Sequence, residues 1–221
     1  MNWLDFLFPK KCVSCGRFGN YFCKNCIKLL NFIEEPVCPV CEKNAIFGKT
    51  HPRCESALSL DGLISIVIYK NPIKKAIYQL KYKFTKDLAN DLVNILFTSK
   101  NTILPNFSDP FLVPIPLHWF RRNWRGFNQT EILGLLISKR LKTRFYPDAL
   151  KKETPTREQV TLKGKERQKN VANIFEADPN VRGKEILLFD DVWTTGATLR
   201  SACGQLKRKG AKTVWGLTLS R

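Results

Sequence analysis

The sequence predicts an α/β fold in which a doubly wound parallel sheet follows an N-terminal cysteine-rich module. Three observations predict this class of fold. All but one of the eight cysteines lie in residues 1–60. From residue 61 to residue 221, apolar runs of strand length alternate with segments of helical periodicity. The segment 186–199 joins a buried strand, two acids and a threonine-rich loop. We therefore expect two parts, residues 1–60 and residues 61–221.

Paired cysteines dominate the first part. Each Cys-x-x-Cys turn presents two thiolates to one tetrahedral ion, so four pairs predict two structural zinc sites. Pairing neighbours assigns Cys12, Cys15, Cys23 and Cys26 to the first site, and Cys38, Cys41, His51 and Cys54 to the second. A cross-braced pairing is the alternative. We favour the sequential pairing because its shorter loops cost less closure entropy.

A disulfide framework is the competing interpretation of these cysteines. Residues 1–9 contain an acid within a short apolar run and no small-residue cleavage site, which argues against a secretory signal. No apolar stretch reaches the roughly eighteen residues that a membrane span needs. We therefore expect a cytoplasmic protein with reduced thiols, in which Cys203 is a small buried residue.

The second part is expected to alternate strands and helices in order. Strands are predicted at 62–69, 111–117, 186–189 and 211–219 from their apolar runs. Helices are predicted at 72–83, 87–97, 131–141 and 199–208 from apolar residues at helical spacing. Residues 105–110 form a proline-bounded linker, and the prolines in 111–117 end that strand abruptly.

A ligand site is predicted where the strand 186–189 ends. Asp190 and Asp191 follow the strand directly, at the edge where open α/β sheets bind ligands. Their side chains should point to opposite faces of the sheet, and either could accept hydrogen bonds from a diol. The next helix begins in a loop that could hold a phosphate on its free N–H groups, and this loop contains Thr194, Thr195, Gly196, Ala197 and Thr198. A helix cap beside two solvated aspartates is the alternative.

Two basic segments are expected to complete the site. Residues 118–129 interleave arginines with aromatics and could hold pyrophosphate or single-stranded DNA through Arg121, Arg122, Arg125, Asn128 and Gln129. Residues 154–175 include Arg167 and have the composition of a lid. Solvated surface loops are the alternative for both. The formal net charge of +18 favours a polyanionic partner.

The segment 186–199 resembles the 5-phosphoribosyl-1-pyrophosphate (PRPP) motif of type I phosphoribosyltransferases. The resemblance implies that Asp190 and Asp191 approach the ribose 2- and 3-hydroxyls and that residues 194–198 surround the 5-phosphate. It also implies Mg²⁺ as the ion that accompanies PRPP. Trp193 departs from the motif, and its indole would either stack on a base or pack.

Taken in order, the motifs resemble the ComF family of late competence proteins. They are the cysteine pairs, Val-Pro-Ile-Pro-Leu at 113–117, Arg-Gly-Phe-Asn-Gln at 125–129, Arg167 with Asn170 and Phe175, and the acids with the loop at 190–196. The resemblance implies a bacterial cytoplasmic protein with a zinc ribbon on a phosphoribosyltransferase-like fold. It further implies action on incoming single-stranded DNA during natural transformation. His51 stands where the family usually has another cysteine.

Three hypotheses about function remain. The leading one is a PRPP-binding competence protein that handles single-stranded DNA. The second is a nucleobase phosphoribosyltransferase of nucleotide salvage with a structural zinc module. The third is a zinc-ribbon adaptor that docks a helicase-type competence protein or a DNA-uptake channel. No nucleobase pocket is readable from the motifs, so catalytic activity stays open.

Overall fold

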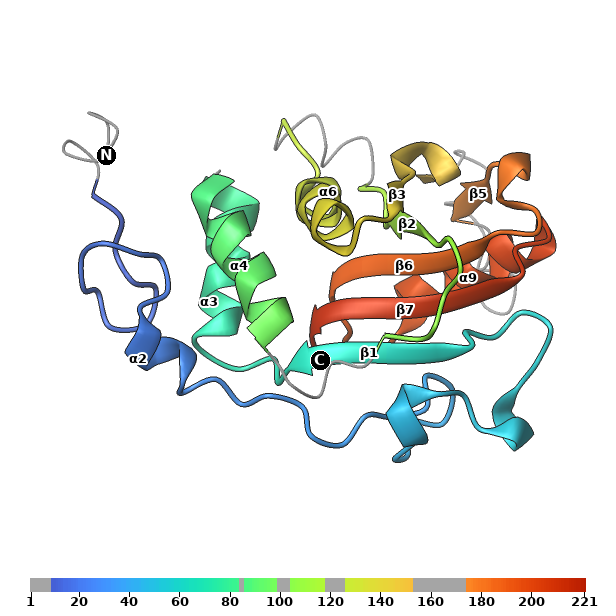
Figure 1. Cartoon of the computed structure of the whole chain (residues 1–221), viewed down its shortest axis with the longest axis horizontal. Coiled ribbons are helices and arrows are strands. Elements are labelled where there is room, and N and C mark those ends of the chain that lie inside the picture. Colours follow the sequence, from blue (N-terminus) through green and yellow to red (C-terminus); the bar gives the residue numbers. More distant parts are fainter. Residues whose placement is uncertain (1–8, 84–85, 99–103, 118–125, 153–173) are drawn as a thin grey trace, which may run out of the picture.

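A fully parallel sheet of five strands lies at the centre of the protein, in the order β1-β7-β6-β2-β3. The computed structural model describes residues 9–83, 86–98, 104–117, 126–152 and 174–221. The strands are β1 (Gly62–Val67), β2 (Phe111–Pro114), β3 (Arg144–Phe145), β6 (Glu185–Val192) and β7 (Thr213–Ser220). Their carboxyl ends point toward the helices α3 and α4 in Figure 1. The predicted α/β class with a parallel sheet is confirmed.

Helices cover both faces of this sheet. One face carries α3 (Ile73–Lys83), α4 (Lys86–Thr98) and α6 (Gln129–Leu141), and the other carries α9 (Ala197–Arg208). Central strand β6 shows why both faces must be covered. Leu187 and Phe189 pack with α3, α4 and α6, whereas Ile186 and Leu188 pack with α9. A strand with apolar residues on both faces is typical of a buried parallel sheet.

The predicted strands and helices lie within a few residues of the observed ones, and the short elements were missed. The unpredicted strands are β3, β4 (Leu150–Lys152) and β5 (Phe175–Ala177), of which β4 and β5 form a separate antiparallel pair. The remaining short elements are α2 (Lys24–Ile27) and the 3₁₀ turns η1 (Ile46–Gly48), η2 (Pro52–Cys54), η3 (Pro147–Ala149) and η4 (Pro179–Val181). Strands of two or three residues show no alternation that a sequence pattern could detect.

Residues 9–60 extend past the helices α3 and α4 and then along the outer strand β1 (Figure 1). We call residues 9–30 the first zinc lobe, residues 31–37 the edge segment and residues 38–60 the second zinc lobe (Figure 1). In the edge segment, the N–H of Ile33 donates to the carbonyl of Ile66 at 2.8 Å, and Phe32 bridges to Val67. The edge segment therefore pairs with the outer strand β1.

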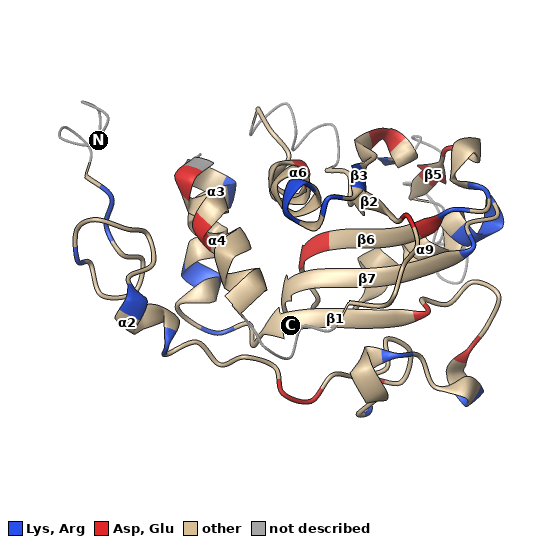
Figure 2. Cartoon of the chain, in the orientation of Figure 1, with Lys and Arg blue, Asp and Glu red and all other residues tan. Residues whose placement is uncertain are grey.

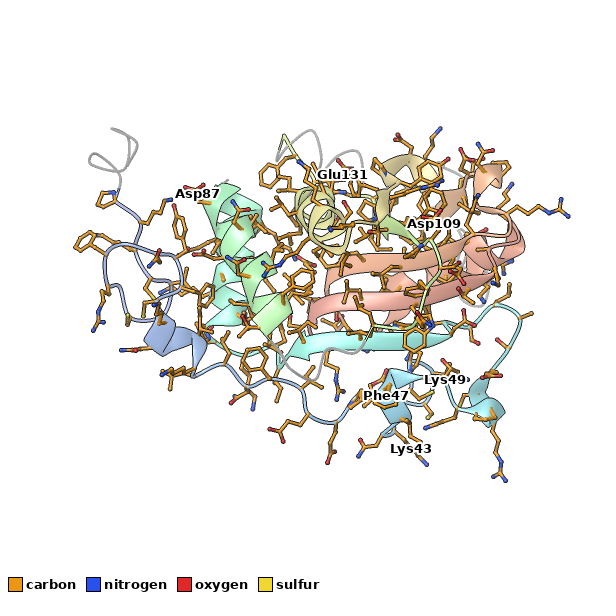
Figure 3. All side chains as sticks on the ribbon, viewed as in Figure 1. Lys43, Phe47, Lys49, Asp87, Asp109 and Glu131 are labelled. Atoms are coloured by element: carbon orange, nitrogen blue, oxygen red, sulfur yellow. The ribbon has the colours of Figure 1, made fainter. Side chains whose placement is uncertain are left out.

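The first zinc lobe is attached to α4. Its residues Val13, Phe22 and Leu30 belong to the same buried cluster as α3 and α4. The N–H of Phe22 donates to the Asp91 carboxylate at 3.2 Å, and burial raises the pKa of that carboxyl. At the start of α4, Asp87 lies 2.7 Å from the ammonium of Lys10 (Figure 3). Apolar packing and polar contacts thus fix this lobe against the helices.

Candidate functional site

The eight expected metal ligands form two groups of four, in the sequential pairing. One group contains Cys12, Cys15, Cys23 and Cys26, and the other Cys38, Cys41, His51 and Cys54. Within each group, all ligand atoms lie within 4.8 Å of one another. A zinc ion with Zn–S bonds of about 2.3 Å needs ligand atoms about 3.8 Å apart. Both groups therefore fit a tetrahedral zinc ion, and no disulfide joins any of the eight cysteines.

Histidine at the second site is oriented for metal binding. Nδ1 of His51 lies 3.3 Å from the sulfur of Cys41, and Nε2 lies 2.9 Å from the carbonyl oxygen of Asn44. A proton on Nε2 would donate to that carbonyl and leave Nδ1 as the ligand atom. Outer hydrogen bonds of this kind fix the tautomer of metal-binding histidines. His51 can thus supply the fourth ligand of this site through Nδ1.

Backbone N–H groups favour one thiolate in each group. Burial alone would raise the pKa of Cys12, but N–H groups of Cys15, Cys23 and Ser14 lower it to about 6. At the second site, the same opposition between burial and backbone N–H groups lowers the pKa of Cys38 to about 7. A thiolate that exists near neutral pH is a ready first ligand for zinc.

The expected phosphate loop lies between β6 and α9, near the carboxyl end of the sheet. Thr194, Thr195 and Thr198 are exposed, and Gly196, which directly precedes α9, leaves the N-terminus of the helix without a side-chain cap. The N–H of Ala197 has only a long contact of 3.5 Å with the hydroxyl of Thr195. Exposed threonines thus flank the N–H groups at the positive end of a helix dipole. This arrangement can bind a phosphate group.

The two acids lie on opposite faces of β6, as the strand period predicts. Asp191 is 5% exposed and forms an ion pair of 2.6 Å with Lys81 of α3. Asp190 accepts a hydrogen bond of 2.8 Å from the N–H of Asp191. Burial, and then the charge of Asp191, raises the pKa of Asp190 well above its usual range. Asp190 is therefore the carboxyl whose charge a ligand hydroxyl or a cation would stabilise.

Lys81 is the residue of this site that the sequence did not indicate. It lies on a helix rich in lysine, more than a hundred positions before its partner, and no local motif distinguishes it from its neighbours. The structure places its ammonium at the end of β6. One of the two acids is thus neutralised from within the protein.

Trp193 packs in the protein core, which is one of the two roles that we expected for its indole. It is 4% exposed, and its ring lies directly beneath Gly196. A Cβ on Gly196 would come within 2.2 Å of that ring, and Gly196 has a φ of 70°. The glycine is therefore required both by the left-handed backbone and by the indole below it.

The basic segments lie mostly outside the described residues. Arg121, Arg122, Arg125 and Arg167 belong to residues that the structure does not describe. Asn128 and Gln129 are described, and both are buried at the start of α6. The carbonyl of the Asn128 side chain accepts from the N–H of Thr130 at 3.2 Å, and its amide donates to the carbonyl of Ile115 at 3.2 Å. Asn128 thus caps α6 and ties it to the end of β2.

A cavity of about 730 Å³ lies beside the second zinc lobe, away from the phosphate loop. Its lining includes Phe47, Lys49, His51 and Trp215. The cavity is predominantly apolar, whereas a phosphoribosyl ligand is highly charged. We therefore place the candidate phosphoribosyl site at residues 190–198 and not in this cavity.

The fold and the two kinds of site define a phosphoribosyltransferase-type α/β protein that carries a double zinc ribbon. Comparisons with known families agree. Residues 3–58 match the Double zinc ribbon domain, and residues 137–219 match the Phosphoribosyl transferase domain. Among the described residues, each helix is too short or too polar to cross a membrane.

Relatives of known name extend over most of the chain. DNA utilization protein YhgH of Salmonella typhi is 31% identical over 69% of this chain and 68% of its own. Competence protein F of Haemophilus influenzae is 27% identical over 98% of both chains. Competence protein ComFC of Bacillus subtilis is 27% identical over 90% of this chain and 83% of its own. The chain belongs to the ComF family, and these relatives support a competence-associated function.

Proposed function

We propose that this protein binds PRPP with Mg²⁺ at the carboxyl end of β6 and handles incoming single-stranded DNA during natural transformation in the cytoplasm. The observation that carries the proposal is the juxtaposition of Asp190 with the uncapped N-terminus of α9. A carboxylate and a phosphate cradle on one strand-to-helix turn match the two ends of a ribose 5-phosphate. The relatives named for competence and DNA utilization support the DNA role.

Each end of the ribose phosphate has its own partner in this site. The exposed hydroxyls of Thr194, Thr195 and Thr198 and the first N–H groups of α9 would hold the 5-phosphate. Asp190 would accept hydrogen bonds from the ribose hydroxyls, and these would stabilise its charged form. Carboxylate oxygens also suit Mg²⁺, which would supply charge neutralisation to the pyrophosphate.

Calorimetric titration of Mg²⁺-PRPP into the zinc-loaded protein tests the ligand. We expect the wild type to bind and Asp190→Asn to bind at least tenfold more weakly. Glu176→Gln is the matched control, because Glu176 is an exposed carboxylate on β5, outside the phosphate loop. Equal affinities for the three proteins would contradict the proposed role of Asp190, and no heat with the wild type would reject the PRPP site.

Single-stranded DNA binding is tested by fluorescence anisotropy of a labelled oligonucleotide across a series of salt concentrations. The net charge of +18 leads us to expect an affinity that falls steeply with salt, because bound cations are released from the phosphates. Arg121→Ala/Arg122→Ala/Arg125→Ala should weaken binding and flatten the salt slope by about 0.7 per lost phosphate contact. A matched Arg182→Ala/Arg208→Ala/Lys209→Ala variant should retain the wild-type slope.

Salvage catalysis remains the alternative within the same site. It requires PRPP-dependent conversion of a free base, which is measured as pyrophosphate release with each common nucleobase. Release with one base and none with the others would favour the enzyme. Binding without release would favour the proposed DNA-handling role.

A docking role for the second zinc lobe is favoured by its exposed apolar side chains. Ile46 is 81% exposed, and Phe47 is 57% exposed with a φ of 52° (Figure 3). A helicase-type competence protein is the partner to test. Phe47→Ser should weaken its binding, whereas Phe18→Ser, which changes an equally exposed residue of the first zinc lobe, should not.

A further inference from the structure

The second zinc lobe and the phosphate loop share one side chain, that of Arg200. This arginine lies in the first turn of α9 and is separated from Pro39 of the second zinc lobe by 161 positions in the chain. Its Nε donates to the carbonyl of Pro39 at 2.7 Å, and one terminal nitrogen forms an ion pair of 2.9 Å with Glu42. Pro39 and Glu42 belong to the turn that presents Cys38 and Cys41. Two of the three donor nitrogens of Arg200 are thus bound to a zinc-ligating turn.

The third nitrogen of Arg200 holds the phosphate loop. It donates to the carbonyl of Thr195 at 2.7 Å, and the guanidinium lies 5.0 Å from the centre of the Trp193 ring. In a planar trans peptide, the carbonyl of one residue and the N–H of the next point in opposite directions. Fixing the carbonyl of Thr195 therefore also fixes the direction of the Gly196 N–H. This N–H lies in the loop that would bind the phosphate.

The zinc-ligating turn is itself shaped for this contact. Glu42 has a φ of 60°, and its N–H donates to the carbonyl of Cys38 at 2.9 Å. A non-glycine residue adopts this left-handed backbone at a cost, so its persistence depends on the surrounding turn. A zinc ion bound by Cys38 and Cys41 would hold that turn closed. Loss of the ion would release both anchors of Arg200 together.

We propose that Arg200 couples the second zinc site to the phosphate loop, so that zinc at that site raises the affinity of the loop for PRPP. Arg200 acts as a positioning residue and touches neither the zinc ion nor the ligand. The coupling preorganises the loop before the ligand arrives, which reduces the ordering cost of binding. This inference rests on the proposed PRPP function. Figure 1 shows the second zinc lobe beneath the sheet, whereas the first zinc lobe lies beside α4.

A matched pair of cysteine variants tests the dependence on the second site. Cys41→Ser and Cys15→Ser each change an exposed second cysteine of a knuckle, one in each site. Each variant should lose one zinc ion, measured by elemental analysis, and retain the far-ultraviolet spectrum of the sheet and helices. In calorimetric titrations with Mg²⁺-PRPP, Cys41→Ser should bind at least tenfold more weakly and Cys15→Ser within twofold of the wild type. Equal losses in both variants would overturn the inference.

Arg200→Lys tests the forked contact while keeping the charge. A single ammonium cannot span Pro39, Glu42 and Thr195 as the guanidinium does. We expect two zinc ions and an affinity for PRPP that is five- to tenfold weaker. Arg208→Lys, at the other end of the same helix, should bind as the wild type does. In a double variant with Cys41→Ser, the two losses should not add, because both break the same connection.

Zinc affinity gives a second readout that a merely structural arginine would not move. If zinc strengthens PRPP binding, PRPP must strengthen zinc binding by the same factor. Equilibrium competition with a chromophoric chelator should show two zinc sites in the wild type, and saturating Mg²⁺-PRPP should raise the zinc affinity of only one of them. Cys41→Ser should lack that site, and Arg200→Lys should retain it without the gain in affinity. Wild-type PRPP binding with no change in either zinc affinity would reject the coupling alone, whereas no PRPP binding at all would reject the proposed function and the coupling together.

Discussion

The ammonium of Lys81 lies 2.6 Å from a carboxylate oxygen of Asp191, and this ion pair joins α3 to the end of β6. Both side chains are largely shielded from water, with 23% and 7% of their surfaces exposed. The contact leaves the two neighbouring acids in different states. Asp191 is paired within the protein, and Asp190 remains for a ligand.

Breaking this ion pair should destabilise the fold. Lys81→Met leaves the carboxylate of Asp191 buried without its partner, which costs about 3 kcal/mol in comparable buried pairs. The coupling between the two side chains is measured by urea unfolding of four proteins. They are the wild type, Lys81→Met, Asp191→Asn and the double variant Lys81→Met/Asp191→Asn. The double variant should be more stable than the sum of the single losses predicts. Strict additivity would show that the pair contributes nothing as a pair.

Asp190→Asn should stabilise the protein without ligand. The pKa of Asp190 is raised in the folded state, so the folded protein binds its proton more tightly than the unfolded chain does. The stability that protonated Asp190 contributes is therefore lost as the pH rises above the pKa of this carboxyl in the unfolded chain, which is about 3.9. The stability of Asp190→Asn relative to the wild type should increase with pH above that value and then level off. Thermal unfolding across the pH range checks this.

Adding Mg²⁺-PRPP should reverse that order. The wild type gains stability from ligand binding, and Asp190→Asn gains little. An Asp190→Asn protein that unfolds at the wild-type temperature at every pH would contradict the raised pKa of Asp190. Glu176→Gln serves again as the control, because its exposed carboxylate should give no difference.

Gly196→Ala should disrupt the phosphate loop by collision with Trp193. Its Cβ would come within 2.2 Å of the indole, so the ring or the loop must move, at a cost of about 1 to 3 kcal/mol. Gly183→Ala is the matched control, because Gly183 has a nearly equal φ of 71° but nothing within 4 Å of a Cβ. Urea unfolding and tryptophan fluorescence of the two variants separate the collision from the backbone strain. Equal changes would refute the packing argument.

Zinc affinity should rise with pH at both sites. Metal binding requires thiolates, and the metal-free groups still hold protons, since the pKa values of Cys26 and Cys54 are raised to about 12 and about 11. Raising the pH lowers the cost of removing those protons. Competition with a chelator at several pH values should therefore show tighter zinc binding and fewer released protons as pH increases. An affinity independent of pH would mean that the thiols ionise before the metal arrives.

The sequence was most informative where its signals are local. The apolar run of β6 and the periodicity of α9 predicted these elements within a few residues. Cysteine spacing predicted both metal groups, because a knuckle is a short-range structure that depends little on the rest of the fold. The strand period also placed Asp190 and Asp191 on opposite faces.

Contacts between distant segments could not be predicted in the same way. Lys81 and Arg200 are ordinary basic residues of helices in the sequence, and only the packing of those helices gives them partners at β6 and at the second zinc lobe. Asn128 shows the opposite case. Its position in a basic, aromatic segment suggested a ligand contact, whereas the structure shows a buried cap that connects α6 to Ile115.

The charge map in Figure 2 shows acids and bases on many elements, including acids in the edge segment that passes below β1. Backbone pairing at Phe32 and Ile33, and again at Lys49 and Gly62, occupies hydrogen-bonding groups that an outermost strand would otherwise offer to a second molecule. The cysteine-rich region therefore covers part of the outer edge of β1, and we expect it to limit self-association through that edge. A chain that begins after residue 60 would present a bare strand edge, and we expect it to aggregate even though the sheet itself is complete.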